Sequence, residues 1–91
     1  MAERSLAMEL IIQERTRQVC VEGWSLKHDD GHTLGQLRDA AWCYYIGTDR
    51  YWPFSMDWYK PGDDRMRTLV KAGALCEAER ARLQRLYFVP G

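Results

Sequence analysis

The sequence predicts an all-α protein: a compact domain of three helices with an aromatic-rich loop between the second and the third. Apolar residues recur at intervals of three and four in three separate stretches, which is the period of an α-helix. Residues that cap or break helices stand at the ends of these stretches. The chain has 91 residues, and a second hydrophobic core would have too little chain to bury itself. We therefore expect residues 1–91 to form a single helical domain.

The first helix is predicted from Ser5 to Glu22. The hydroxyl of Ser5 is suited to accept a hydrogen bond from an amide of the first turn, and Gly23 is suited to the left-handed backbone that often follows a helix. The middle of this helix, residues 13–18, is entirely polar. Such a stretch is unusual in a helix that must contribute to a small core.

The second helix is predicted from Thr33 to Ile46. Thr33 and Gln36 have the spacing of a capping box, in which each side chain accepts a hydrogen bond from the other residue's backbone amide. We expect Gly47 to end the helix. Its buried stripe is predicted to consist of Leu34, Leu37, Ala41 and Tyr44.

The third helix is predicted from Asp64 to Tyr87, with Asp63 as its N-cap after the Pro-Gly break at residues 61–62. In its middle, residues 72–74 form a patch of small side chains where another backbone can approach closely, either within the molecule or from a second subunit. The inner face of this helix is predicted to contain Met66, Leu69, Val70, Gly73, Cys76 and Leu83.

Between the second and third helices, residues 48–62 form an aromatic loop. Most of its rings are expected to cover a core that is too small to close with aliphatic side chains alone. One or two rings could instead contact a ligand, because flat rings stack on nucleobases and the neighbouring Lys60 can hold a phosphate. The rings are those of Tyr51, Trp52, Phe54, Trp58 and Tyr59.

Composition limits the cellular compartment and the classes of partner that we expect for this protein. Thirteen basic and thirteen acidic residues give a net charge of zero, which argues against a uniformly basic surface for long nucleic acids. Cys20, Cys43 and Cys76 are odd in number and far apart, so they form neither a complete disulfide set nor a zinc knuckle. We expect all three to be small buried residues in a reducing cytoplasm. The sequence contains no signal peptide pattern and no membrane-spanning apolar run.

A polar constellation covers the second half of the first helix and the segment that follows it. Glu14, Gln18 and Glu22 are spaced four residues apart, on one face of the helix. Carboxylates and imidazoles are ligands that divalent metals choose, but the same groups also cap helices and close turns, so both interpretations stay open. No nucleophile elbow and no phosphate-binding glycine loop is present. The second half of the constellation is His28, Asp29, Asp30 and His32.

These motifs resemble those of a group of small bacteriophage and prophage proteins. The matching runs are Glu14-Arg15-Thr16-Arg17-Gln18, Glu22-Gly23-Trp24-Ser25 and His28-Asp29-Asp30-Gly31-His32. Further matches are Ala40-Ala41-Trp42-Cys43-Tyr44, the Trp-Pro and Trp-Tyr-Lys-Pro pairs of the aromatic loop, and residues 69–75. Gln36 replaces the glutamate that the group usually has. The resemblance covers most of residues 14–83 and implies a phage protein in the cytoplasm of the host cell.

Among small phage proteins are oligomeric sponges that sequester nucleotide signals of bacterial immunity. By this analogy we expect a homo-oligomeric protein that sequesters a small anionic, nucleotide-derived ligand, with no catalytic residue and no cofactor. The indole rings would stack on the base, the basic side chains would face phosphate, and the histidines and acids would recognise polar groups. The predicted ligand-binding residues are Arg17, Glu22, Trp24, His28, Asp29, His32, Trp52, Trp58, Lys60 and Lys71.

Two alternatives remain at this stage. All-α nucleotide pyrophosphatases hold magnesium with carboxylates on paired helices, so the chain could instead be a metal-dependent nucleotide hydrolase. In that case Mg²⁺ or Mn²⁺ would be held by Glu14, Glu22, Asp29 and Asp30, and His32 would assist proton transfer. The other alternative is a protein-interaction module that inhibits a host enzyme through the aromatic loop.

Overall fold

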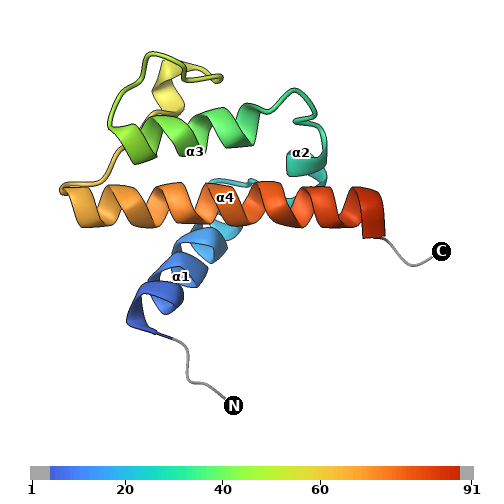
Figure 1. Cartoon of the computed structure of the whole chain (residues 1–91), viewed down its shortest axis with the longest axis horizontal. Coiled ribbons are helices and arrows are strands. Elements are labelled where there is room, and N and C mark those ends of the chain that lie inside the picture. Colours follow the sequence, from blue (N-terminus) through green and yellow to red (C-terminus); the bar gives the residue numbers. More distant parts are fainter. Residues whose placement is uncertain (1–4, 89–91) are drawn as a thin grey trace.

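The computed structural model describes residues 5–88 and confirms the all-α fold. Its elements are α1 (Leu6–Cys20), α2 (Leu26–Asp30), α3 (Gln36–Ile46), the 3-10 turn η1 (Met56–Trp58) and α4 (Arg65–Phe88), and no strand occurs within the described residues. Helices α1, α3 and α4 are the three predicted helices. The long α4 lies in the middle, with α3 alongside it on one side and α1 crossing it on the other (Figure 1).

The ends of α1 follow from local chemistry. Ser5 caps the helix as predicted, because its hydroxyl accepts a hydrogen bond from the amide of Met8 at 3.1 Å. The helix ends at Cys20, two residues earlier than expected. Gly23 adopts a left-handed backbone with φ of 75°, and this turn lets the amide of Trp24 donate to the carbonyl of Gln18 at 3.0 Å.

Two features differ from the prediction between α1 and α3. The short helix α2 is capped by the hydroxyl of Ser25, which accepts from the amide of His28 at 3.2 Å. Helix α3 begins at Gln36, so the capping box with Thr33 does not form. Gly35, with φ of 80°, turns the chain into α3 instead, and the Gln36 side chain accepts from the Leu34 amide at 2.8 Å.

Glycine and aspartate set the remaining boundaries. Gly47 ends α3 as predicted, with φ of 81° and its amide donating to the carbonyl of Cys43. The cap of α4 is Asp64 and not Asp63, because the Asp64 carboxylate accepts from the amide of Arg67 at 2.8 Å.

The core lies between α3, α4 and the aromatic loop. Leu37 and Leu75 are fully buried, and alanines at the facing positions let the two helices approach closely. The prediction that loop rings cover the core is confirmed for three of them, Trp52, Phe54 and Tyr59. The buried cluster consists of Trp24, Leu37, Ala40, Ala41, Tyr44, Ala72, Leu75 and Ala78.

The predicted inner face of α4 is wrong in its rotational phase. Positions expected inside are exposed, among them Met66, Leu69, Cys76 and Leu83. Small side chains face α3 because they allow a short distance between the helices, and Gly73 faces α1, where a Cβ atom would lie 2.8 Å from Cδ1 of Ile11. The small-residue patch therefore serves an internal contact. The buried positions of α4 are Thr68, Ala72, Ala74, Leu75, Ala78 and Arg82.

Cys43 is buried as predicted, whereas Cys20 and Cys76 are exposed. Among residues 5–88, no helix is both long enough and apolar enough to cross a bilayer.

Candidate functional site

A pocket of about 380 Å³ opens where the end of α1, the helix α2 and the loop around η1 meet. Four of its lining residues are predicted ligand-binding residues. Three of them, Glu22, Trp24 and His28, lie between the end of α1 and the end of α2, and the fourth, Trp58, comes from the loop. Sequence reasoning missed Phe54 and Ser55 as pocket residues. Phe54 is one of the rings of the aromatic loop, but nothing in the sequence singles out Ser55. The wall is formed by Glu22, Gly23, Trp24, His28, Phe54, Ser55 and Trp58.

Trp24 forms the base of this pocket and is almost fully buried. The turn at Gly23 fixes its backbone, and its ring stacks on His28 with the ring centroids 6.1 Å apart. Its indole also meets Phe54 and Trp58 at tilted angles, with centroids 6.0 and 6.4 Å away. Trp24 is therefore both a core residue and a pocket wall.

Trp58 is the accessible ring of the site, because 43% of its surface is exposed. The Nζ atom of Lys60 lies 5.6 Å from the centroid of this ring, in cation–π contact. Lys60 is therefore at the edge of the pocket without being part of its wall. A flat ligand that packs against Trp58 would come within reach of this ammonium group.

Trp52, also a predicted ligand-binding residue, does not line the pocket. Its indole NH donates to the carbonyl of Ser55 at 3.1 Å, and its ring packs edge-on against Tyr44 and Phe54. The hydroxyl of Tyr44 accepts from the amide of Lys60 at 3.0 Å, and burial raises the pKa of Tyr44 to about 12. Trp52 and Tyr44 thus hold the loop that carries Phe54 and Trp58.

The two histidines form a pair beside the pocket. Their Nε2 atoms are 3.4 Å apart, and the ring of His32 also meets Phe54 edge-on at 5.0 Å. Burial, and then the neighbouring His28, lower the pKa of His32, so its ring is neutral at neutral pH. His28 reaches the pocket wall, whereas His32 lies behind it.

Asp29, also a predicted ligand-binding residue, is completely buried and is not part of the pocket wall. One carboxylate oxygen forms an ion pair with Arg15. The other has no hydrogen-bond partner within residues 5–88 and lies 3.7 Å from Nδ1 of His28. Asp29 therefore links α1 to α2 and is placed to orient the His28 ring.

A buried charge cluster explains the polar middle of α1. Glu14 is 1% exposed, and Arg17 donates two hydrogen bonds to it, at 2.9 and 2.8 Å. Arg67 of α4 also donates to this carboxylate, Gln18 donates at 3.2 Å, and Nζ of Lys71 lies 4.0 Å away. Burial alone would raise the pKa of Glu14, but the hydrogen bonds and the three cations together lower it.

Arg17 connects this cluster to the pocket. Its Nη1 donates to the Glu22 carboxylate at 3.1 Å, and a third of its side chain remains exposed. Together Arg17, Arg67 and Lys71 carry one more charge than Glu14 and Glu22. Lys71 does not reach the pocket wall, because it lies beside Glu14 in the cluster, where burial lowers its pKa.

The four acids predicted as metal ligands are not gathered at one point. Glu14 and Glu22 are paired with Arg17, Asp29 with Arg15, and Asp30 with Arg85 at 2.6 Å. Within residues 5–88, no three histidine, cysteine, aspartate or glutamate side chains form a group that could hold a metal ion. The predicted Mg²⁺ or Mn²⁺ set is therefore not present in this arrangement.

Comparison of the chain with protein-family models, with curated proteins and with solved structures found no match. The geometry of the pocket is therefore the main basis for assigning a function. Its wall offers ring faces for stacking, one carboxylate as an acceptor and one imidazole, and cations lie at its edge.

Proposed function

We propose that this chain is a phage-type binding protein that holds a small nucleotide-derived anion in the pocket between Trp24 and Trp58. The observation that carries the proposal is the composition of the pocket wall: two indoles, a phenyl ring, an imidazole and one carboxylate. A volume of about 380 Å³ lies within the range of roughly 300–1,000 Å³ for small-molecule sites. This size suits a mononucleotide.

Each class of group in the pocket has a counterpart in a nucleotide. The exposed ring of Trp58 provides a stacking platform for the base. The carboxylate of Glu22 accepts hydrogen bonds, so it suits a base edge that carries NH groups. Lys60 and the exposed part of Arg17 supply positive charge for a phosphate, and His28 suits a ribose hydroxyl.

Binding alone is sufficient for sequestration. The proposed role is that of a sponge, in which a phage protein withdraws a nucleotide signal from the defence system of its host. This role rests on the resemblance of the sequence motifs and on the pocket, and it requires neither a nucleophile nor a general base.

Calorimetric titration with linear and cyclic purine and pyrimidine nucleotides tests the proposal. Loss of one stacking ring costs about 1–3 kcal/mol per base, so Trp58→Ala should weaken binding by roughly 5- to 150-fold. Tyr51→Ala is the matched control, because Tyr51 is a similarly exposed ring that lies outside the pocket. Glu22→Gln should change the preference among bases more than it changes the affinity for phosphate. No heat with any nucleotide would refute the proposal.

A second measurement separates the sponge from the hydrolase. The protein is incubated with the bound nucleotide and Mg²⁺ or Mn²⁺, then heated, and the released compound is analysed by chromatography. Recovery of the intact nucleotide supports sequestration. Turnover to products would favour the hydrolase.

A further inference from the structure

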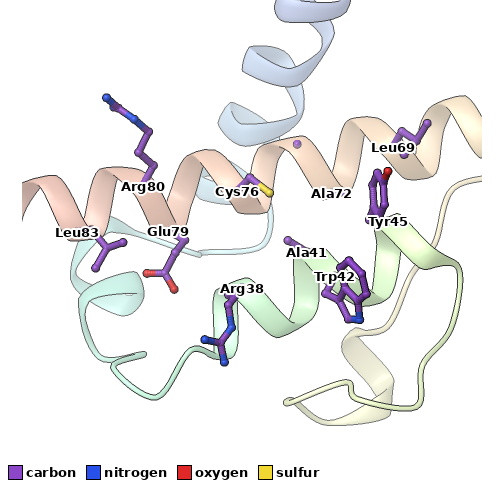
Figure 2. A pocket seen from close by; sticks show the side chains of 11 residues that line it. Arg38, Ala41, Trp42, Tyr45, Leu69, Ala72, Cys76, Glu79, Arg80 and Leu83 are labelled. Atoms are coloured by element: carbon purple, nitrogen blue, oxygen red, sulfur yellow. The ribbon is translucent and has the colours of Figure 1, made fainter.

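A larger hollow of about 650 Å³ lies between α3 and α4 (Figure 2). It shares no residue with the pocket between Trp24 and Trp58. A third hollow, of about 600 Å³, lies between α1 and α4. The two adjoin along α4, because Gly73, Cys76 and Arg80 line both of them. We call this continuous surface, formed by residues of α1, α3 and α4, the α4 face.

The α4 face exposes large apolar side chains from all three helices. Trp42 and Tyr45 of α3 are 51% and 54% exposed and stack on each other with centroids 5.9 Å apart. Figure 2 shows Tyr45 directed toward Leu69 across the hollow, and Leu83 lies further along α4. On the α1 side, Met8 and Ile12 are also exposed. These side chains line two adjoining hollows and are not scattered singly over the surface.

The spacing of apolar residues in α4 indicates that the α4 face is an interaction surface. Leu69, Gly73, Cys76 and Leu83 follow a helical spacing typical of a buried stripe, yet the structure leaves Leu69, Cys76 and Leu83 exposed. The helix is therefore apolar on two sides, and its other side already packs in the core. Ala41, Ala72 and Gly73, whose small side chains serve the packing of α4 against α3 and α1, also line the larger hollow and leave it unfilled.

The exposed area is suited to a dimer. Half-exposed rings of Trp42 and Tyr45 leave on the order of 200 Å² open, since an aromatic side chain buries about 150–250 Å² in full. Four aliphatic side chains add a similar amount. The resulting patch of roughly 400 Å² lies within the range of about 300–600 Å² for the largest apolar patch of a monomer, and such patches often bind a partner. It supplies about half of the roughly 800 Å² that each partner contributes to a standard interface.

The charges around the face select the partner. Arg38 and Arg80 stand at its rim together with Glu77 and Glu79, so both signs are present. A rim with both signs can be complementary to a second copy of itself, whereas a rim of one sign would repel it. The net charge of the chain is zero, so two copies do not repel each other at long range. We infer that the α4 face binds a second copy of this chain and forms a two-fold symmetric dimer.

The first test is the mass in solution across a wide range of protein concentrations, by light scattering. We expect a mass of twice 10.7 kDa that falls toward the monomer on dilution, and a melting temperature that rises with protein concentration. Tyr45→Glu should raise the dimer dissociation constant at least tenfold. Tyr51→Glu is the matched control, because Tyr51 is also 54% exposed but lies outside the face.

A second test needs no substitution. Cys76 lies at the centre of the α4 face, whereas Cys20 is exposed elsewhere. Alkylation of Cys76 should slow as protein concentration rises, and alkylation of Cys20 should not change. A monomer at every concentration, even one that captures another protein through this face, overturns the inference. A dimer that survives Tyr45→Glu with Cys76 unprotected overturns it too.

Discussion

Replacing Glu14 by glutamine tests whether the buried charge cluster stabilises the fold. The substitution keeps the shape of the side chain but removes the negative charge that Arg17, Arg67 and Lys71 surround. Breaking a buried ion pair costs about 3–5 kcal/mol. Solvent screens this cluster in part, since a third of Arg17 and 39% of the Arg67 side chain are exposed, so we expect a loss of about 2–3 kcal/mol.

That loss is large for this chain. A small domain is stable by about 5–15 kcal/mol, and 1 kcal/mol shifts the melting temperature of a 60–100-residue domain by about 4–8 °C. Glu14→Gln should therefore lower the melting temperature by at least about 8 °C. The measurement is urea and thermal unfolding followed by circular dichroism, at equal protein concentrations because dimer formation makes stability depend on concentration.

Asp39→Asn is the control for Glu14→Gln. Asp39 pairs with Arg38 at 3.2 Å on the exposed surface, and such pairs contribute at most about 1 kcal/mol. The pH dependence provides a second check. The pKa of Glu14 is lowered in the fold from its ordinary 4.5, so its stabilising contribution is complete above that pH and is lost as the pH falls below it. If Glu14→Gln lost no more stability than Asp39→Asn, or kept the same acid dependence as the wild type, the reasoning would be wrong.

Three further predictions concern packing, the histidine pair and the loop. Gly73→Ala should lower the free energy of unfolding by about 1 kcal/mol. Overpacking against Ile11 costs about 1–3 kcal/mol, which exceeds the gain from the better helix propensity of alanine. Unfolding experiments should show a smaller loss when Ile11→Ala is added to the same chain. The lowered pKa of His32 means that its neutral form is favoured in the fold, so the melting temperature should fall as the pH drops below 6.5, and His32→Gln should flatten that slope. Tyr44→Phe should cost about 1 kcal/mol by leaving the Lys60 amide without its acceptor, and amide hydrogen exchange of the loop should accelerate.

Helices α1, α3 and α4 could be predicted because short-range interactions set many of their ends. The prediction failed where one sequence pattern is compatible with two arrangements. Ser5 and Gly47 act at the ends of helices through hydrogen bonds and backbone angles that depend on a few neighbours. Helix α2 was missed because five residues are too short for a periodic pattern. The phase of α4 was wrong because both of its sides are apolar, and periodicity alone does not show which side faces the core.

The part of the candidate site that is built from neighbouring residues of the sequence could be predicted. Glu22, Trp24 and His28 lie close together in sequence, and the turn at Gly23 brings them to one pocket. The path of the aromatic loop depends on long-range packing, so the sequence did not distinguish Trp58, which lines the pocket, from Trp52, which supports the loop. The sequence presents the charged residues of α1 as ligand candidates. It does not show that Glu14 pairs with Arg67 of α4, which lies 53 residues away in the sequence.

The central position of α4 has a consequence for the folding of the protein during its synthesis. Helices α1, α2 and α3 all pack against α4 and make few contacts with one another, yet all three precede it in the chain. A nascent polypeptide has therefore no lasting support for its earlier segments until residues 65–88 have left the ribosome. Folding during translation is delayed until these residues have been synthesised, and a transcript cut short before that point yields a product that proteases and chaperones would meet as an unfolded chain.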